Sequence, residues 1–237
     1  MRRPQLVPLV LAAAVAATAA GCTLIGDPGP ATTQERTISA VTAVDLRTSG
    51  DVTITTGGEA ALTITAGENV IDRLTSTVRG TELVLGTTPT PFVGNLGRVE
   101  YDLVLPTVDE ITVSGSGGVS VKRITGSELE ITISGSGTVA AGSVAVEEVR
   151  TTVSGSGSIG ITGATDALQV RISGSGRFEG FDPEAEDAEV TVSGSGRAEI
   201  DASSTLDIEI AGSGSVRYTG DAAVTSEISG SGSVSRR

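Results

Sequence analysis

The sequence has no histidine, no tryptophan and a single cysteine, Cys22, among its 237 residues. The lack of histidine excludes imidazole acid–base relays and imidazole metal ligands, and one cysteine excludes thiolate metal clusters. Aromatic residues are scarce as well, with three phenylalanines and two tyrosines. The core must therefore be thin and built from valine, isoleucine, leucine and alanine, as in a solenoid, where each turn packs only on its neighbours.

Positive charge is also scarce. The formal net charge is −13, from 16 basic and 29 acidic residues. Such a surface repels phosphate backbones, and no basic stripe is visible along the sequence, so we exclude nucleic acid as a partner. The acidity is expected to keep the protein soluble and its surface self-repelling, and binding of a cation or polycation is the alternative.

The first 21 residues have the layout of an export signal, with two arginines, an apolar run from Leu6 to Ala17, and then small residues. The run is too short for a good membrane span. Ala19-Ala20-Gly21-Cys22 resembles the lipobox of bacterial lipoproteins, in which the cysteine is acylated and becomes the first mature residue. By this resemblance residues 1–21 are a lipoprotein signal peptide and Cys22 is the lipidation site. The alternative is an ordinary cleaved signal that leaves a free thiol.

Residues 22–37 are rich in glycine, proline and polar side chains and lack periodic hydrophobicity, so we predict a flexible tether. Strand-like alternation of apolar and polar residues then lasts to Pro106. Residues 38–106 are predicted to form irregular β coils, with one short helical turn within residues 69–74. Residues 87–98 contain prolines and glycines and are predicted to be an irregular excursion, a place where functional loops occur.

A four-residue motif, Ser-Gly-Ser-Gly, recurs through the second half of the chain. Successive copies are spaced by 20, 20, 19, 20, 18 and 18 residues, and alanine replaces the first serine once: Ser114, Ser134, Ser154, Ser173, Ser193, Ala211 and Ser229. Apolar residues around each copy keep period two, so one side of each strand is buried and the other is solvated. Residues 107–237 are therefore predicted to be a regular array that continues residues 38–106 as one domain.

The constant place of the motif selects between two architectures. In an antiparallel barrel the motif would alternate between the two ends, whereas in a solenoid it recurs at one place in every coil. We therefore predict an all-β fold, a parallel β-helix or solenoid with coils of about 20 residues and right-handed winding. The motif is predicted to form the coil corner, with glycines facing inward and serines outward, where they hydrogen-bond from coil to coil. A variable return of about ten residues completes each coil.

The sequence assigns no catalytic residue, cofactor or metal site. Carbohydrate-cleaving β-helix enzymes are the enzymatic alternative, but their grooves need clustered carboxylates and aromatic platforms for sugar rings. The densest carboxylate group lies in residues 179–189, where oxygen ligands at alternate positions suit Ca²⁺, and the alternative is a solvated acidic loop. Phosphate binding by the glycine-rich corners is disfavoured, because phosphate loops open a helix and carry a lysine.

Three segments carry a family resemblance: Thr48–Ile54, Tyr101–Pro106 and the Ser-Gly-Ser-Gly series. Through them residues 38–235 resemble the bacterial exported proteins described as "putative auto-transporter adhesin, head GIN domain". The resemblance implies a β-helical domain at the cell surface or in the envelope, often on lipoproteins, with no known catalytic residues and no assigned function.

We accordingly expect a non-enzymatic, extracytoplasmic protein, anchored to the cell membrane by lipid, with an adhesin-like or surface-interaction role. Its expected partners are the membrane, through the anchor, and a polysaccharide or a surface protein. The alternatives are a carbohydrate-active β-helix enzyme and a structural or signalling envelope component with a membrane-protein partner.

Overall fold

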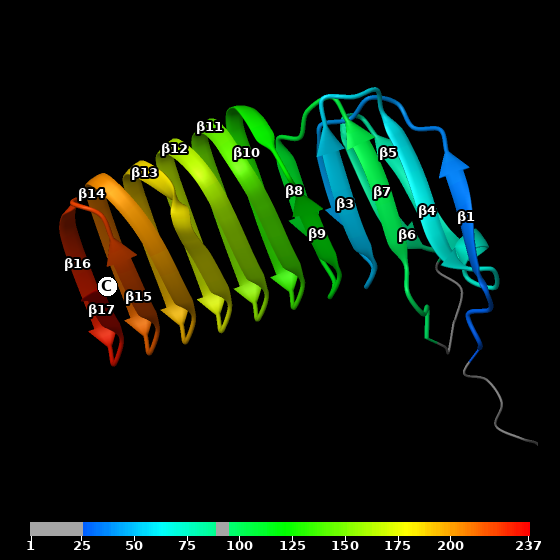
Figure 1. The fold of residues 1–237 in the computed structure, drawn as a ribbon. Coiled ribbons are helices and arrows are strands. Elements are labelled where there is room, and N and C mark those ends of the chain that lie inside the picture. The colour runs from blue at the N-terminus through cyan, green and yellow to red at the C-terminus, as the bar shows by residue number, and fades with distance from the viewer. Residues whose placement is uncertain (1–25, 89–94) are drawn as a thin grey trace, which may run out of the picture.

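The computed structural model describes residues 26–88 and 95–237, without the side chains of residues 181–183. The predicted signal peptide and Cys22 lie outside the described residues, as does half of the predicted excursion at residues 87–98. The 17 strands join in one continuous sheet that winds into an elongated solenoid (Figure 1). The described ranges hold no α-helix and one short 3-10 helix, so the all-β prediction is confirmed. No helix in these ranges is long and apolar enough to cross a membrane.

The second half of the chain is a stack of parallel coils. It begins with β8 (Glu110–Val113) and β9 (Gly118–Val121), which flank the first corner. β10 (Ile124–Gly135) then runs from the first return to the second corner. Four longer strands each run from one corner to the next: β11 (Thr138–Gly155), β12 (Ser158–Gly174), β13 (Arg177–Gly194) and β14 (Arg197–Gly212). The stack ends with β15 (Ser215–Thr219), β16 (Ala223–Gly230) and β17 (Ser233–Arg236). Every pairing among these strands is parallel, which confirms the predicted solenoid.

Each regular coil has three faces. On the first face, before the corner, Leu129–Ile133 pair with Val149–Val153 of the next coil, and on the second face, after the corner, Thr138–Ala141 pair with Ser158–Ile161. The third face is the return. The return was predicted to be variable, but its paired segments form a short parallel sheet, as where Ile124–Gly126 pair with residues 144–146. Segments of about three residues are too short for period-two alternation to be recognised in the sequence.

The corner glycines face inward, as predicted. At Gly155 the φ angle is +131°, and a Cβ there would lie 2.5 Å from the carbonyl oxygen of Gly135 in the preceding coil. At Gly157, the second glycine of the same corner, a Cβ would lie 2.5 Å from Cγ2 of Ile133. The first glycine is therefore needed for its backbone conformation and for space, and the second for space alone. The serines of this corner, Ser154 and Ser156, are exposed.

Main-chain groups, and not serine hydroxyls, join successive corners. The amide of Ser156 donates to the carbonyl oxygen of Gly135 at 2.9 Å, and the amide of Ser158 donates to that of Gly137 at 3.0 Å. The predicted serine ladder is wrong, since no hydrogen bond in the described structure joins the hydroxyls of two corner serines. The reason is that exposed hydroxyls can be satisfied by water, whereas main-chain groups close to the core need a protein partner.

The first half of the chain stacks on the same axis in an order that departs from the sequence (Figure 1). The strands β2 (Ala43–Leu46) and β3 (Asp51–Thr56) pair in parallel with β8 and β9. On their other side they pair in parallel with β6 (Glu82–Thr87) and β7 (Glu100–Leu105). The coil made by β2 and β3 therefore lies between two coils that follow it in sequence.

Antiparallel strands close the amino-terminal end of the stack. There β7 pairs with β4 (Ala61–Gly67), and β6 pairs with β5 (Leu74–Arg79). Between β4 and β5 lies a 3-10 helix, η1 (Ile71–Arg73), inside the range predicted to form a helical turn. Buried side chains from both halves of the molecule belong to one core cluster.

The outermost strand at this end is β1 (Ala31–Arg36), which pairs with β4 in antiparallel fashion. Residues 31–36 therefore belong to the folded domain, which corrects the prediction of a flexible tether over residues 22–37. An edge strand needs no buried side, so the polar residues of β1 show no apolar alternation. Main-chain pairing holds it, together with Arg36, whose Nη1 donates to the carbonyl oxygen of Leu74 at 2.7 Å.

The buried phenol of Tyr101 should make folding stability depend on pH. Its side chain is 1% exposed, and its hydroxyl has no hydrogen-bond partner among the described residues. Burial raises the pKa of this phenol above 10.0, and the nearby Thr48 hydroxyl and Arg36 offset that only in part. Stability is then full below pH 10.0 and falls as the pH rises, because the phenol ionises first in the unfolded chain.

Tyr101→Phe removes an unpaired buried polar atom, so we expect unchanged or higher stability at neutral pH and a smaller loss in alkali. Urea unfolding of both proteins at neutral pH and above pH 10.0 measures the two effects. The same alkaline loss in both proteins would contradict this account of Tyr101.

Candidate functional site

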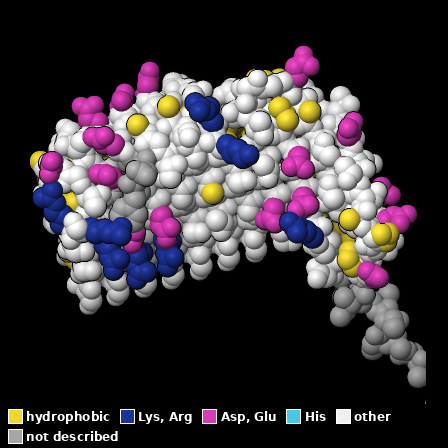
Figure 2. Space-filling view, viewed as in Figure 1, with side chains coloured by type: hydrophobic (Ala, Val, Ile, Leu, Met, Phe, Trp, Pro, Cys, Tyr) yellow, Lys and Arg dark blue, Asp and Glu magenta, His cyan; other side chains and the backbone are white. Residues whose placement is uncertain are grey.

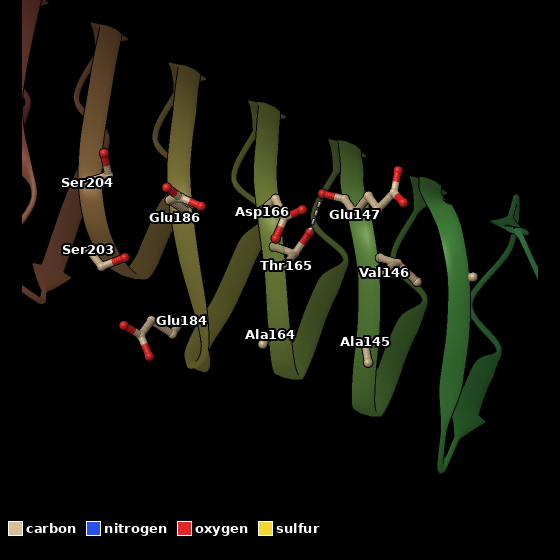
Figure 3. Close-up of a pocket in the computed structure, with 11 residues that line it drawn as sticks. Ala145, Val146, Glu147, Ala164, Thr165, Asp166, Glu184, Glu186, Ser203 and Ser204 are labelled. Atoms are coloured by element: carbon tan, nitrogen blue, oxygen red, sulfur yellow. Dashed lines mark hydrogen bonds between the residues drawn. The ribbon is translucent and has the colours of Figure 1, made fainter.

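The third face carries an open groove of about 570 Å³ that crosses several successive returns (Figure 3). Its floor includes the small side chains of Ala145 and Ala164, and carboxylates stand along it. Thr165 is buried beneath the groove, and its Oγ1 lies 3.1 Å from the carbonyl oxygens of both Glu147 and Ala167. This hydroxyl therefore links its own coil to the preceding one, in addition to the main-chain pairing between them.

Parallel pairing explains why the carboxylates form a row. Thr165 pairs with Val146 in the coil before and with Ala185 in the coil after. The residues that follow these three, Glu147, Asp166 and Glu186, therefore occupy equivalent positions, and all three are exposed. Figure 3 shows them side by side on neighbouring strands. An exposed acidic row of this kind suits cationic or hydroxyl-rich groups.

The groove lacks features that the enzymatic alternative requires. Carbohydrate-cleaving sites need aromatic platforms beside their carboxylates. No aromatic side chain belongs to the described lining of this groove, which consists of small, aliphatic, hydroxyl and carboxylate residues. The carboxylates are present, but the sugar-ring platforms that would accompany them are missing from this part of the surface.

The carboxylates in residues 179–189 that were considered as Ca²⁺ ligands do not come together where their side chains are described; the side chain of Asp182 lies outside the described part. Because β13 winds around the coil as one strand, Glu179 lies on the second face, Glu186 on the third and Glu189 on the first. Among the residues whose side chains are described, no group of three or more acidic, histidine or cysteine side chains could hold a metal ion. Acidic residues at alternate positions would suit a cation if the segment were a loop that folds back on itself. In a continuous strand that winds around the coil, the same carboxylates are carried apart.

A second hollow, of about 650 Å³, lies on the second face and is lined by small residues such as Ala140 and Gly160. A Cβ at Gly160 would have no atom within 4 Å, so this glycine is required neither for space nor for a positive φ angle. It differs in both respects from the corner glycine Gly155.

Sequence reasoning missed a group of basic side chains on the second face, named here the arginine row: Arg177, Arg197 and Arg217. Arg177 and Arg197 directly follow successive corners and pair in register. Figure 2 shows dark blue side chains gathered over the carboxyl-terminal coils. The signal was present in the sequence, because each of these two arginines follows a Gly-Ser-Gly segment, 20 residues apart. In a solenoid of that period, such residues must stack.

Comparisons with known proteins agree with this architecture. Residues 40–222 match the family described as "Putative auto-transporter adhesin, head GIN domain". A "putative adhesin" from Bacteroides fragilis NCTC 9343 superimposes with a TM-score of 0.81 at 20% identity, covering 88% of this chain and 97% of that one. A "putative lipid binding protein" from Parabacteroides distasonis ATCC 8503 has a TM-score of 0.74 at 25% identity, with coverages of 88% and 97%. A "putative adhesin" from the same strain has a TM-score of 0.78 at 19% identity, with coverages of 88% and 98%. No curated protein matches the chain.

Proposed function

The chain belongs to the family described as "putative auto-transporter adhesin, head GIN domain", and from this premise we propose that it is a non-enzymatic, lipid-anchored envelope protein with a surface-interaction role. The observation that supports this most is the in-register stacking of its coils. Stacking repeats outward side chains about every 4.8 Å along the axis, so polar rows stand on a rigid scaffold. Many weak contacts along such rows suit a repetitive polar polymer or a broad surface.

The anchor is the part of the proposal that rests on sequence. Ala19-Ala20-Gly21-Cys22 has the small residues before cysteine that lipoprotein maturation requires, and the chain has no second cysteine that could pair with Cys22. Each acyl CH₂ buried in a bilayer contributes about 0.8 kcal/mol, so several chains on one residue hold a protein stably at a membrane.

Replacing Cys22 by serine tests the anchor. We expect the natural chain in the membrane fraction, from which detergent releases it, and the Cys22→Ser chain in the soluble fraction, because serine accepts no thioether-linked lipid. Fractionation of cells producing each protein, followed by immunodetection, measures the distribution. Urea unfolding of both chains serves as the control, since Cys22 lies outside the described domain and its change should not alter stability. Equal partition of the two proteins would remove the anchor from the proposal.

A further inference from the structure

The arginine row is an exception on an acidic molecule. The chain has 16 basic residues against 29 acidic ones, yet Arg177, Arg197 and Arg217 lie on three successive coils. Arg217 is two positions farther along its strand than Ser215, the residue that pairs with Arg197. Arg171 lies across the corner from Arg177, on the first face. The side chains of Arg171, Arg177 and Arg217 are 51%, 50% and 57% exposed.

The fold does not require arginine at these positions. The other coils of the second half place small residues at the position of Arg177 and Arg197, directly after the corner: Gly118, Thr138, Ser158, Ser215 and Ser233. Adjacent strands lie about 4.8 Å apart, and like charges directly opposite each other on such strands are destabilising. The pair formed by Arg177 and Arg197 therefore costs free energy of folding that a serine or threonine at the same position would not.

Contacts within the chain do little to offset this repulsion. Arg177 Nη1 lies 3.5 Å from Glu179 Oε1, and Arg217 Nη1 lies 3.5 Å from Glu199 Oε1. Both side chains of the Arg177–Glu179 pair are about half exposed, and exposed pairs of this kind contribute only about 0–1 kcal/mol. In the second pair Glu199 is 17% exposed, but the 3.5 Å separation and the exposed Arg217 keep the contact weak. Arg197 donates from Nε to Ser215 Oγ at 3.3 Å, and no carboxylate in the described structure lies within salt-bridge distance of it. The row thus keeps most of its guanidinium donors for a partner outside the chain.

We propose that the arginine row binds a linear anionic polysaccharide, a partner class that deepens the proposed surface-interaction function and rests on it. The guanidinium group is a planar fork that matches carboxylate and sulfate oxygens through two parallel hydrogen bonds. Stacked coils present such forks along the axis, and the exposed corner serines Ser175 and Ser195 lie beside them as further donors. Nucleic acid is the weaker fit, because bases need exposed aromatic platforms. Among the described aromatic side chains of these coils, Phe178 is fully buried and Tyr218 packs against the core.

Binding to immobilised polygalacturonate tests the proposal, with the full mature chain kept soluble in neutral detergent and neutral dextran as the reference polymer. We expect binding to polygalacturonate that weakens with salt, and a loss of about tenfold or more in affinity in the double variant Arg177→Gln/Arg197→Gln. The matched control is Arg79→Gln/Arg98→Gln, which removes the same charge from exposed arginines at the other end of the molecule. This control should bind like the natural chain.

Two results would overturn the arginine row as the site. One is equal weakening by both double variants, which would mean that net charge alone governs binding. The other is tighter binding to single-stranded DNA than to polygalacturonate. Retention on purified cell envelope separates this proposal from the proposed function, provided that both chains carry Cys22→Ser and hence no lipid. If the Cys22→Ser chain is retained equally with and without Arg177→Gln/Arg197→Gln, the surface-interaction function stands and the row fails. If neither chain is retained at low salt, the surface-interaction function fails as well.

Discussion

Replacing Gly155 by alanine should lower the free energy of unfolding by about 2–5 kcal/mol, combining the cost of a positive φ angle with that of overpacking. The φ angle of Gly155 is +131°, a conformation that alanine rarely adopts. The new Cβ would also lie 2.5 Å from the Gly135 carbonyl oxygen. That oxygen accepts the Ser156 amide hydrogen bond between coils, so the backbone has little freedom to move away.

The matched control for this change is Gly160→Ala, in the following strand. It adds the same methyl group at an open position, where no atom lies within 4 Å of the new Cβ and φ is not positive. The effect there should be within about 0.5 kcal/mol. Urea unfolding followed by circular dichroism measures both variants. If the two substitutions cost the same, the corner glycines are not selected for conformation and space.

Phe178→Ala should have the second large effect, a loss of about 3–5 kcal/mol. Phe178 is fully buried on the second face, where it pairs with Ile159 in one neighbouring coil and with Ala198 in the other. The aromatic ring therefore stacks beside a methyl group, which is the alternation of large and small side chains that fills a thin core. Alanine would leave a cavity, and the coils could not move together to fill it because main-chain hydrogen bonds hold them at a fixed spacing.

The control for the core substitution is Phe178→Leu, which keeps most of the apolar volume and should cost about 1.5 kcal/mol or less. Urea unfolding compares the midpoints and slopes of the two variants with those of the natural chain. A cost for Phe178→Ala as small as that for Phe178→Leu would show that the coils relax around the missing ring. The solenoid would then be more adaptable than its in-register pairing indicates.

The sequence was sufficient for the regular half of the fold because its information is local and repeated. Period-two alternation identifies strands such as Leu129–Ile133, and the constant spacing of Ser-Gly-Ser-Gly requires each strand to stack on the one before. The inward glycines follow from the same parity. The serine ladder failed because parity tells which side chains face water, but not which groups hydrogen-bond.

The order of the amino-terminal coils could not be predicted in this way. Placing β2 and β3 between β6–β7 and β8–β9 depends on pairings between segments far apart in sequence, and no repeat spacing encodes them. Edge strand β1 was missed for a related reason, since a strand held by main-chain bonds needs no apolar pattern. Alternation was also misleading in residues 179–189, where carboxylates at alternate positions reach different faces.

The arginine row shows that a site can be encoded by the repeat itself. Along the linear sequence, acidic residues separate Arg177 from Arg197, so a scan of local charge does not reveal them as a group. The 20-residue spacing, once translated into stacked coils, places them on adjacent strands. Binding surfaces on a solenoid are best sought by comparing equivalent positions of successive coils.

We expect the solenoid to bind an envelope component without transforming it. Incubation of purified cell-envelope polysaccharide with the full mature chain in neutral detergent tests this directly, by measuring bound protein and soluble saccharide over time. We expect saturable, salt-sensitive binding and no release of soluble fragments above the level seen without protein. Progressive release of saccharide fragments by the natural chain would contradict it and would assign the protein to the carbohydrate-active β-helix enzymes.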